Sequence, residues 1–175
     1  MKIIFLDIDG VLNSEEWFDS EEYTSNKYIE INGVSCNNEM NEEFVKNLKD
    51  IVEHTGAEIV LCSTWRHISS HHSPIIYLNH MLNKYGLSIL DKTGKTKPSF
   101  RPKEIKEWLD NHDVESFVIL DDDYNYDEYA TCGIAKHLVR TRFYGKDGGL
   151  QLSYVSKAIK KLENDWDLNN DLGEK

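Results

Sequence analysis

Two aspartates separated by one residue offer the clearest chemistry in this sequence. Asp7 and Asp9 follow the apolar run at residues 3–6, and Gly10 allows a tight turn directly after them. One carboxylate can attack the phosphorus of a phosphate ester if a divalent cation offsets the repulsion between the two anions. A second carboxyl nearby can protonate the leaving oxygen and then activate water. The pair therefore predicts metal-dependent hydrolysis of a phosphate ester.

Two more apolar runs end in polar clusters that fit the same chemistry. Residues 59–62 lead into Ser63 and Thr64, whose hydroxyl groups can donate hydrogen bonds to phosphoryl oxygens. Residues 117–120 lead into three consecutive aspartates, which offer the oxygen ligands that Mg²⁺ prefers. A cation at a helix start would balance the charge of the phosphate, and Arg101 and Lys103 are candidates for it.

These clusters need a scaffold that brings distant segments together. The three apolar runs are continuous and rich in branched residues, which is typical of strands buried on both faces of a parallel sheet. Helical periodicity at residues 41–54 and 102–111 separates the runs and indicates an α/β fold. A further strand is expected at residues 135–139 and a closing helix at 155–162. Ligands bind beyond the carboxyl ends of the strands in such sheets, so we expect the polar clusters to converge there.

Two segments lie outside this alternation. Residues 14–38 show strand-like alternation followed by Asn32-Gly33, a hairpin signal that predicts a flap or small cap. Residues 67–97 contain an amphipathic helical pattern at 75–85 and are a candidate insertion. The expected organisation is a single domain at residues 1–163 and a polar tail at residues 164–175.

The composition indicates a soluble protein of a reducing compartment. With 39% hydrophobic and 29% charged residues, the chain is neither disordered nor a membrane protein. Its formal net charge of -11 repels polyanions, so non-specific nucleic-acid binding is not expected. The three cysteines lack the spacing of a disulfide or zinc framework, and the N-terminal run is too short and too acidic for a signal peptide. We therefore expect a cytoplasmic location and no membrane partner.

The polar clusters together strongly resemble the haloacid dehalogenase (HAD) superfamily. The motifs are Phe-Leu-Asp-Ile-Asp-Gly-Val-Leu-Asn, Leu-Cys-Ser-Thr-Trp-Arg and Val-Ile-Leu-Asp-Asp-Asp. The resemblance runs from the first residue to about residue 127. It implies a Rossmann-like HAD fold, in which helices flank a central parallel sheet, with a small or minimal cap.

The resemblance also implies roles for individual residues. Asp7 would be the nucleophile, Asp9 the general acid and base, and Ser63 a phosphate contact. Mg²⁺ would be held by Asp7, the Asp9 carbonyl and Asp122, with Asp121 adjacent. A carboxylate at the position of Asp9 is typical of the phosphatase branches, which favours phosphate chemistry over dehalogenation.

The cation of the family is matched less closely. Arg101-Pro102-Lys103-Glu104-Ile105 resembles the pattern Lys-Gly-x-x-Leu, which makes Arg101 the first candidate, with Lys103 and Lys97 as alternatives. The Ser-Thr-Trp-Arg element and the helix start resemble the HAD branch of Swiss Army Knife RNA-repair proteins. By that analogy Arg66 contacts a substrate phosphate or base, and Thr64 joins it as a substrate-binding candidate.

We therefore expect a Mg²⁺-dependent phosphomonoesterase that acts through an aspartyl-phosphate. Its substrate would be a phosphorylated small molecule, a nucleotide or a nucleic-acid end. For a nucleic-acid end, the basic stretch of Lys92, Lys95 and Lys97 is the first place to expect contact. The alternative is a non-catalytic phosphate- or partner-binding module on the same scaffold, and the intact Asp7/Asp9 pair speaks against it.

Overall fold

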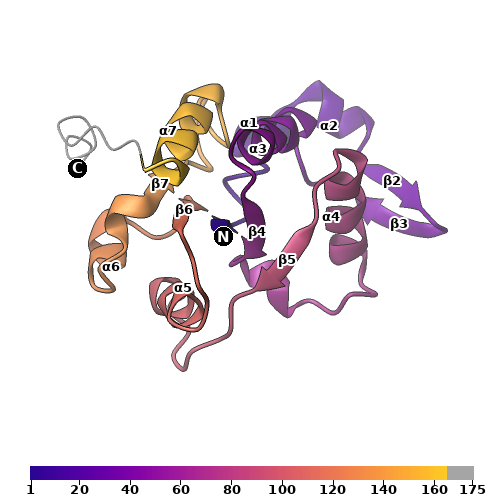
Figure 1. The fold of residues 1–175 in the computed structure, drawn as a ribbon. Coiled ribbons are helices and arrows are strands. Elements are labelled where there is room, and N and C mark those ends of the chain that lie inside the picture. The colour runs from indigo at the N-terminus through magenta and orange to yellow at the C-terminus, as the bar shows by residue number, and fades with distance from the viewer. Residues whose placement is uncertain (165–175) are drawn as a thin grey trace.

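The computed structural model describes residues 1–164 and has a central sheet of five parallel strands (Figure 1). The strand order is β5-β4-β1-β6-β7, so the strand that carries the Asp7/Asp9 pair lies in the middle. The strands are β1 (Lys2–Leu6), β4 (Glu58–Leu61), β5 (Ile89–Lys92), β6 (Ser116–Asp121) and β7 (Leu138–Arg140). The predicted α/β class with a central parallel sheet is confirmed.

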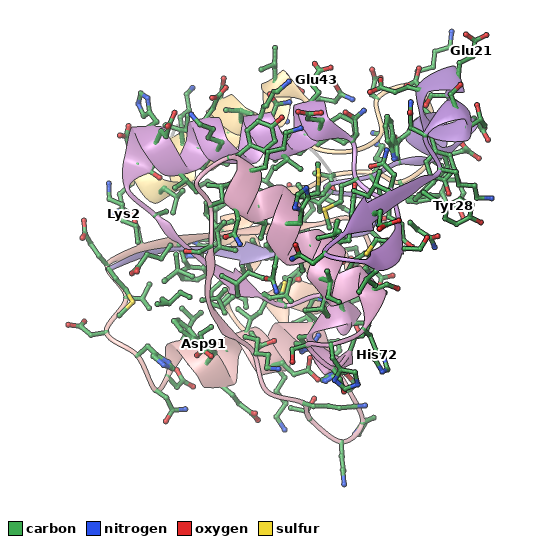
Figure 2. The ribbon with its side chains drawn as sticks, turned by 90° about the vertical axis from the view of Figure 1, so that its right-hand side faces the viewer. Lys2, Glu21, Tyr28, Glu43, His72 and Asp91 are labelled. Atoms are coloured by element: carbon green, nitrogen blue, oxygen red, sulfur yellow. The ribbon has the colours of Figure 1, made fainter. Side chains whose placement is uncertain are left out.

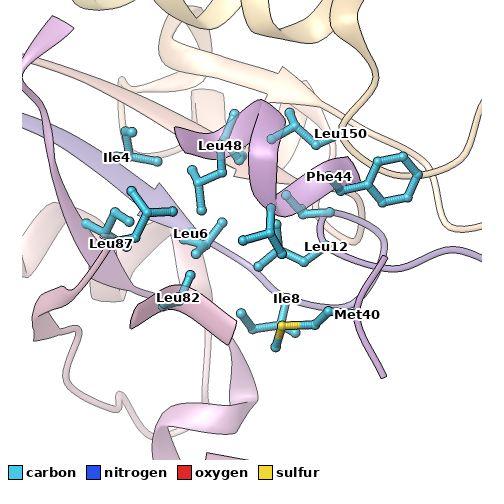
Figure 3. Close-up of a cluster of buried hydrophobic side chains, with 14 of the residues drawn as sticks. Ile4, Leu6, Ile8, Leu12, Met40, Phe44, Leu48, Leu82, Leu87 and Leu150 are labelled. Atoms are coloured by element: carbon cyan, nitrogen blue, oxygen red, sulfur yellow. The ribbon is translucent and has the colours of Figure 1, made fainter. Parts of the chain in front are cut away.

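Helices cover both faces of the sheet (Figure 1). The helices that pack on one face are α3 (Glu42–Thr55), α4 (Ser73–Lys84) and α7 (Leu152–Leu162). Those on the other face are α5 (Arg101–Leu109) and α6 (Tyr126–Ala130). Alternate residues of β1 enter the two cores, since Ile4 and Leu6 join the first and Ile3 and Phe5 the second (Figure 3). The middle strand is therefore buried on both faces, as its continuous apolar run predicts.

The predicted helices begin and end close to the capping residues that the sequence contains. Asn41 caps α3 by accepting a hydrogen bond from the Glu43 amide at 2.9 Å, and Gly56 ends the helix with a φ of 68°. The patterns at residues 75–85, 102–111 and 155–162 correspond to α4, α5 and α7 with small shifts of their ends. The strand expected at residues 135–139 begins later, because residues Ala135–His137 form a 3₁₀ turn ahead of β7.

The segment at residues 14–38 forms two short helices and a hairpin. These are α1 (Glu15–Asp19), α2 (Glu21–Ser25), β2 (Tyr28–Ile31) and β3 (Val34–Asn37). Asn32 and Gly33 both have positive φ, 51° and 80°, as the predicted two-residue turn requires. Figure 2 places Tyr28 of the hairpin at the opposite end of the molecule from Lys2, the first residue of β1. The hairpin therefore lies on the side toward which the parallel strands run.

The segment at residues 67–97 differs from the candidate insertion that the sequence suggested. It forms α4 and β5, and β5 pairs in parallel with β4 as an edge strand of the central sheet. Helix α4 packs both on the core and on β3, and the Tyr77 hydroxyl accepts a hydrogen bond from the Met40 amide at 3.1 Å. The segment is thus part of the fold that supports the hairpin.

Two further expectations concern cysteines and membranes. All three cysteines are free, as their spacing indicated. Among residues 1–164, no helix is long and apolar enough to cross a membrane. The predicted tail lies outside the described residues except for Asn164.

Candidate active site

Asp7 lies at the carboxyl end of the central strand and is almost fully buried, with 3% of its surface exposed. Its amide donates a hydrogen bond to the Leu120 carbonyl at 3.0 Å, which continues the pairing of β1 with β6. Its Oδ1 accepts a hydrogen bond from the Ile8 amide at 2.8 Å. The carboxylate is thus fixed by the backbone on a rigid strand end.

Arg101, the first residue of α5, bridges the two buried carboxylates of the site. One guanidinium nitrogen, Nη1, donates to Asp7 Oδ2 and also to Asp121 Oδ1, the latter at 2.5 Å. Arg101 is itself buried, and its guanidinium lies over the ring of Tyr124 at 5.2 Å from the centroid. Among the cations proposed from the sequence, Arg101 is therefore the one that the structure brings to Asp7.

Asp121 and Asp122 complete an acidic cluster with Asp7. Each of the three offers a carboxylate oxygen within 4.8 Å of the others, which suits a cation that prefers several oxygen ligands. Asp121 is fully buried and accepts hydrogen bonds from the Tyr129 hydroxyl and, at 2.9 Å, from the Asp123 amide. The Asp9 carboxylate is not part of this cluster, and coordination by its main-chain carbonyl stays a prediction.

Burial raises the pKa values of two carboxyl groups of the site, Asp7 and Asp122. Burial raises the pKa of Asp7 to about 7, and Asp121 adds to the rise while Arg101 and the Ser63 hydroxyl oppose it. Burial and the charges of Asp121 and Asp123 likewise raise the pKa of Asp122 to about 6. Neighbouring carboxylates that ionise with difficulty favour a bound cation, because the cation removes their mutual repulsion.

Gly10 lets the loop after β1 approach this cluster closely. Its φ of 70° is in the left-handed region, and a Cβ at this position would overlap the Asp122 side chain. Glycine is thus required here both by the turn and by the space that Asp122 occupies.

Ser63 caps the turn after β4 and lies next to Asp7. Its hydroxyl oxygen accepts a hydrogen bond from the Trp65 amide at 3.3 Å and so caps the 3₁₀ turn at Thr64–His67. The same side chain hydrogen-bonds Asp7 and is fully buried. Capping therefore positions the hydroxyl beside the acidic cluster.

The motifs that carry the acidic cluster lie within the range that one family model matches. A family model described as the HAD domain in Swiss Army Knife RNA repair proteins matches residues 3–151, and this range contains every element of the cluster. The chain belongs to this family. No curated protein and no solved structure matched the chain.

Asp9 of this HAD domain differs from Asp7 because it is exposed. Its Oδ1 accepts a hydrogen bond from Asn13 Nδ2 at 2.9 Å, and its Oδ2 accepts one from Trp65 Nε1 at 3.0 Å. The side-chain oxygen of Asn13, Oδ1, in turn accepts a hydrogen bond from the Gly10 amide at 2.9 Å. Both carboxylate oxygens of Asp9 are therefore oriented while the group stays open to solvent.

Arg66 is turned away from the acidic cluster and bound inside the protein. Its Nη1 donates to the Cys62 and Ser63 carbonyls at 2.5 and 2.7 Å, and its Nη2 donates to Glu104 Oε2 at 2.5 Å. Only 2% of its side chain is exposed. Both terminal nitrogens are thus engaged by protein oxygens, and the substrate contact expected of Arg66 stays a prediction.

The remaining substrate-binding candidates lie at the surface. Thr64 is exposed at the beginning of the 3₁₀ turn. The Lys103 ammonium lies 3.7 Å from the Glu107 carboxylate on the exposed side of α5, and Lys97 is exposed in the preceding loop. A substrate role for these three residues stays a prediction.

Three contacts of the site were missed by the sequence analysis. Tyr129 bonds Asp121 from α6, and Asn13 and Trp65 hold Asp9. Asn13 and Trp65 both stand inside the motifs, so the motif positions themselves carried a signal. No local sequence pattern pointed to Tyr129, because only the packing of α6 on the sheet brings its hydroxyl to Asp121.

Proposed function

We propose that this HAD domain is a Mg²⁺-dependent phosphomonoesterase that works through an aspartyl-phosphate on Asp7. The observation that supports it most is the contrast between the two aspartates of the pair. Asp7 is buried against Arg101, whereas Asp9 is exposed with both oxygens oriented by hydrogen bonds. A desolvated carboxylate suits a nucleophile, and a solvent-accessible one suits a group that exchanges protons with a leaving group and with water.

The reaction has two half-steps. First, an Asp7 oxygen bonds to phosphorus as the bond to the leaving oxygen breaks, and Asp9 gives that oxygen its proton. Then the Asp9 carboxylate takes a proton from water, the water oxygen bonds to phosphorus, and the bond between phosphorus and Asp7 breaks. Inorganic phosphate leaves and both aspartates return to their starting states.

The residues present fit the metal that this chemistry needs. Asp7, Asp121 and Asp122 would hold Mg²⁺, with the Asp9 carbonyl as a further ligand, because hard carboxylate oxygens gather there. When bound, Mg²⁺ offsets the repulsion between the phosphate and Asp7. Arg101 balances the charge of the phosphoryl oxygens from the side of α5.

The description of the family supports a nucleic-acid end or a nucleotide as the substrate over a small metabolite. We also propose that the protein works in the cytoplasm, which agrees with its three free cysteines.

Hydrolysis of an aryl phosphate, with Mg²⁺ and with EDTA, tests the proposed activity. Asp7→Asn removes the nucleophile, and Asp50→Asn, at an exposed position of α3, is the matched control. We expect Mg²⁺-dependent turnover in the wild type and the control, and a loss of about a thousandfold or more in Asp7→Asn. Circular dichroism establishes that each variant is folded. A folded wild type without turnover would instead favour a binding module.

A further inference from the structure

A large cleft begins at the acidic cluster and follows the loop after β7. Its volume is about 1260 Å³, and Asp122 forms part of its wall. Pockets for small ligands typically have volumes of ~300–1,000 Å³, so this cleft exceeds what a single small metabolite needs. A substrate whose phosphate lies at Asp7 would therefore have room to extend along the β7 side.

Two arginines line the cleft directly beyond the strand end. Arg140 is the last residue of β7 and pairs in register with Asp121, and Arg142 lies two residues further. Both are exposed, and within residues 1–164 the structure gives neither side chain an ion pair or a hydrogen bond. In a protein of net charge -11, two arginines without acidic partners that line one cleft form a local site for an anion. Asp123 and Asp147 also line the cleft, so the anion is placed at the arginines.

Thr141, between the two arginines, provides an independent sign of a ligand. Only 1% of its surface is exposed, and its hydroxyl has no hydrogen-bond partner among the described residues. Its amide donates to the Asp121 carbonyl at 3.0 Å, which fixes the residue beside the acidic cluster. Buried polar groups are nearly always satisfied, and this unpartnered hydroxyl belongs to a residue that lines the cleft.

Aromatic rings stand on the same cleft. Tyr144 is 72% exposed, and Tyr154 lies on α7. Tyr154 is partly buried. Accessible tyrosine rings beside arginines are the combination on which nucleic-acid bases stack while phosphates bind the cations.

We propose that this cleft binds a single-stranded polynucleotide next to its terminal phosphate. Arg140 and Arg142 hold the adjoining phosphodiester, Tyr144 and Tyr154 stack on bases, and the Thr141 hydroxyl bonds an oxygen of the backbone. The proposal rests on the proposed function, because the terminal phosphate of the strand would lie at Asp7. The basic stretch at residues 92–97 begins on β5, the opposite edge of the sheet, and is not the binding surface.

Binding of a dye-labelled single-stranded oligonucleotide with a terminal phosphate tests this surface. Fluorescence anisotropy is measured in EDTA with the full chain, so the result does not depend on turnover. Arg140→Gln/Arg142→Gln should raise the Kd at least about tenfold and reduce the slope of log affinity against log salt by ~0.7, because both arginines hold one phosphate. Tyr144→Ala should raise the Kd about 5- to 10-fold.

Matched variants control for charge and for an exposed ring. Lys46→Gln/Lys49→Gln removes two positive charges on α3, and Tyr28→Ala removes an aromatic ring that is 64% exposed on the hairpin. Both should bind within about twofold of the wild type, on the scale of surface changes away from a site.

The proposal would be overturned by no binding by the wild type, by equal binding by the arginine variant, or by tighter arginine-dependent binding of a phosphopeptide than of the oligonucleotide. Loss of binding in Lys95→Gln/Lys97→Gln alone would place the strand at the β5 edge and overturn it as well. The aryl phosphate assay separates this failure from that of the proposed function, because an aryl phosphate carries no adjoining phosphodiester for the arginines to bind. Turnover without binding in the cleft would reject only the proposed polynucleotide-binding surface. Arginine-dependent binding without turnover would reject only the proposed phosphatase activity.

Discussion

At the residue scale, the two aspartates of the pair are held by different kinds of contact. Asp7 is bound by backbone groups and by Arg101 inside the protein, so its position follows from the strand. Asp9 is exposed, and its orientation depends on two side-chain donors, Asn13 and Trp65. A group that must both give and accept a proton needs such an orientation, since proton transfer requires hydrogen-bond reach.

Trp65→Phe should therefore impair proton transfer while it preserves the buried ring. The substitution removes the Nε1 donor to Asp9, and we expect kcat to fall about tenfold for an alkyl phosphate, whose leaving group needs the proton. The fall should be smaller for an aryl phosphate, whose leaving group departs with little protonation. Trp108→Phe is the matched control, because Trp108 is equally buried at 7% exposure and donates to Asp91 at 2.7 Å. An equal fall in kcat for both substrates would show that Trp65 supports only the folded structure and not proton transfer.

At the scale of elements, α5 is held to the loop after β4 by a buried ion pair. Oε2 of Glu104 accepts a hydrogen bond from the Arg66 guanidinium. Oε1 of Glu104 accepts hydrogen bonds from the Thr96 amide at 3.0 Å and from the Ser99 hydroxyl at 2.8 Å. Burial raises the pKa of Glu104, but the hydrogen bonds from Thr96 and Ser99 and the charge of Arg66 lower it by more. The pair fixes the helix that begins at Arg101 relative to the turn that carries Ser63.

Glu104→Gln should strongly destabilise the protein. Because the substitution leaves the Arg66 guanidinium buried without a carboxylate, the free energy of unfolding should fall by about 3–5 kcal/mol. Glu107→Gln, three residues along α5, breaks an exposed pair with Lys103 and should cost at most about 1 kcal/mol. Urea unfolding of both variants measures the difference, and similar small losses would mean that the buried pair does not hold α5.

The sequence predicted the elements whose periodicity is strong and missed those built by tertiary contacts. The central strands are continuous apolar runs and α3 has signals at both ends, so their positions followed directly. The edge strand β5 (Ile89–Lys92) has only one partly buried residue, so its apolar run is too short to recognise. The partnership of Arg66 with Glu104 joins residues 38 positions apart, and local pattern carries no sign of it. For the same reason the sequence did not indicate that Arg66 is buried against Glu104.

At the scale of the whole molecule, His137 joins the second core to the sheet and makes stability depend on pH. Its Nδ1 lies 2.9 Å from the Phe117 carbonyl, and its ring stacks on the Phe117 ring with centroids 3.7 Å apart. Burial lowers the pKa of His137 to about 4, with Lys136 and Lys161 adding to the effect. The folded protein therefore binds this proton less readily than the unfolded chain does.

Stability should consequently fall as the pH drops from about 6.5 to about 4, because the unfolded state binds the proton across that window and the folded state does not. The contribution of His137 is about 2 kcal/mol, since each unit of pKa shift corresponds to ~1.4 kcal/mol and the ring is partly exposed. Urea unfolding in EDTA is compared between the wild type and His137→Gln. The difference in pH dependence isolates the contribution of His137, because the carboxyl groups that also titrate are the same in both proteins. A difference between the two proteins that stays constant across this window would contradict the prediction.

The central claim is that the reaction passes through an aspartyl-phosphate on Asp7, and trapping this intermediate tests the claim most directly. In Asp9→Asn an aryl phosphate can still transfer its phosphoryl group, because its leaving group needs little protonation, whereas water is no longer activated. Acid quenching with Mg²⁺ present, followed by peptide mass spectrometry, should find the phosphoryl group on the peptide that contains Asp7. Phosphate on another residue, or turnover that persists in Asp7→Asn, would contradict the account.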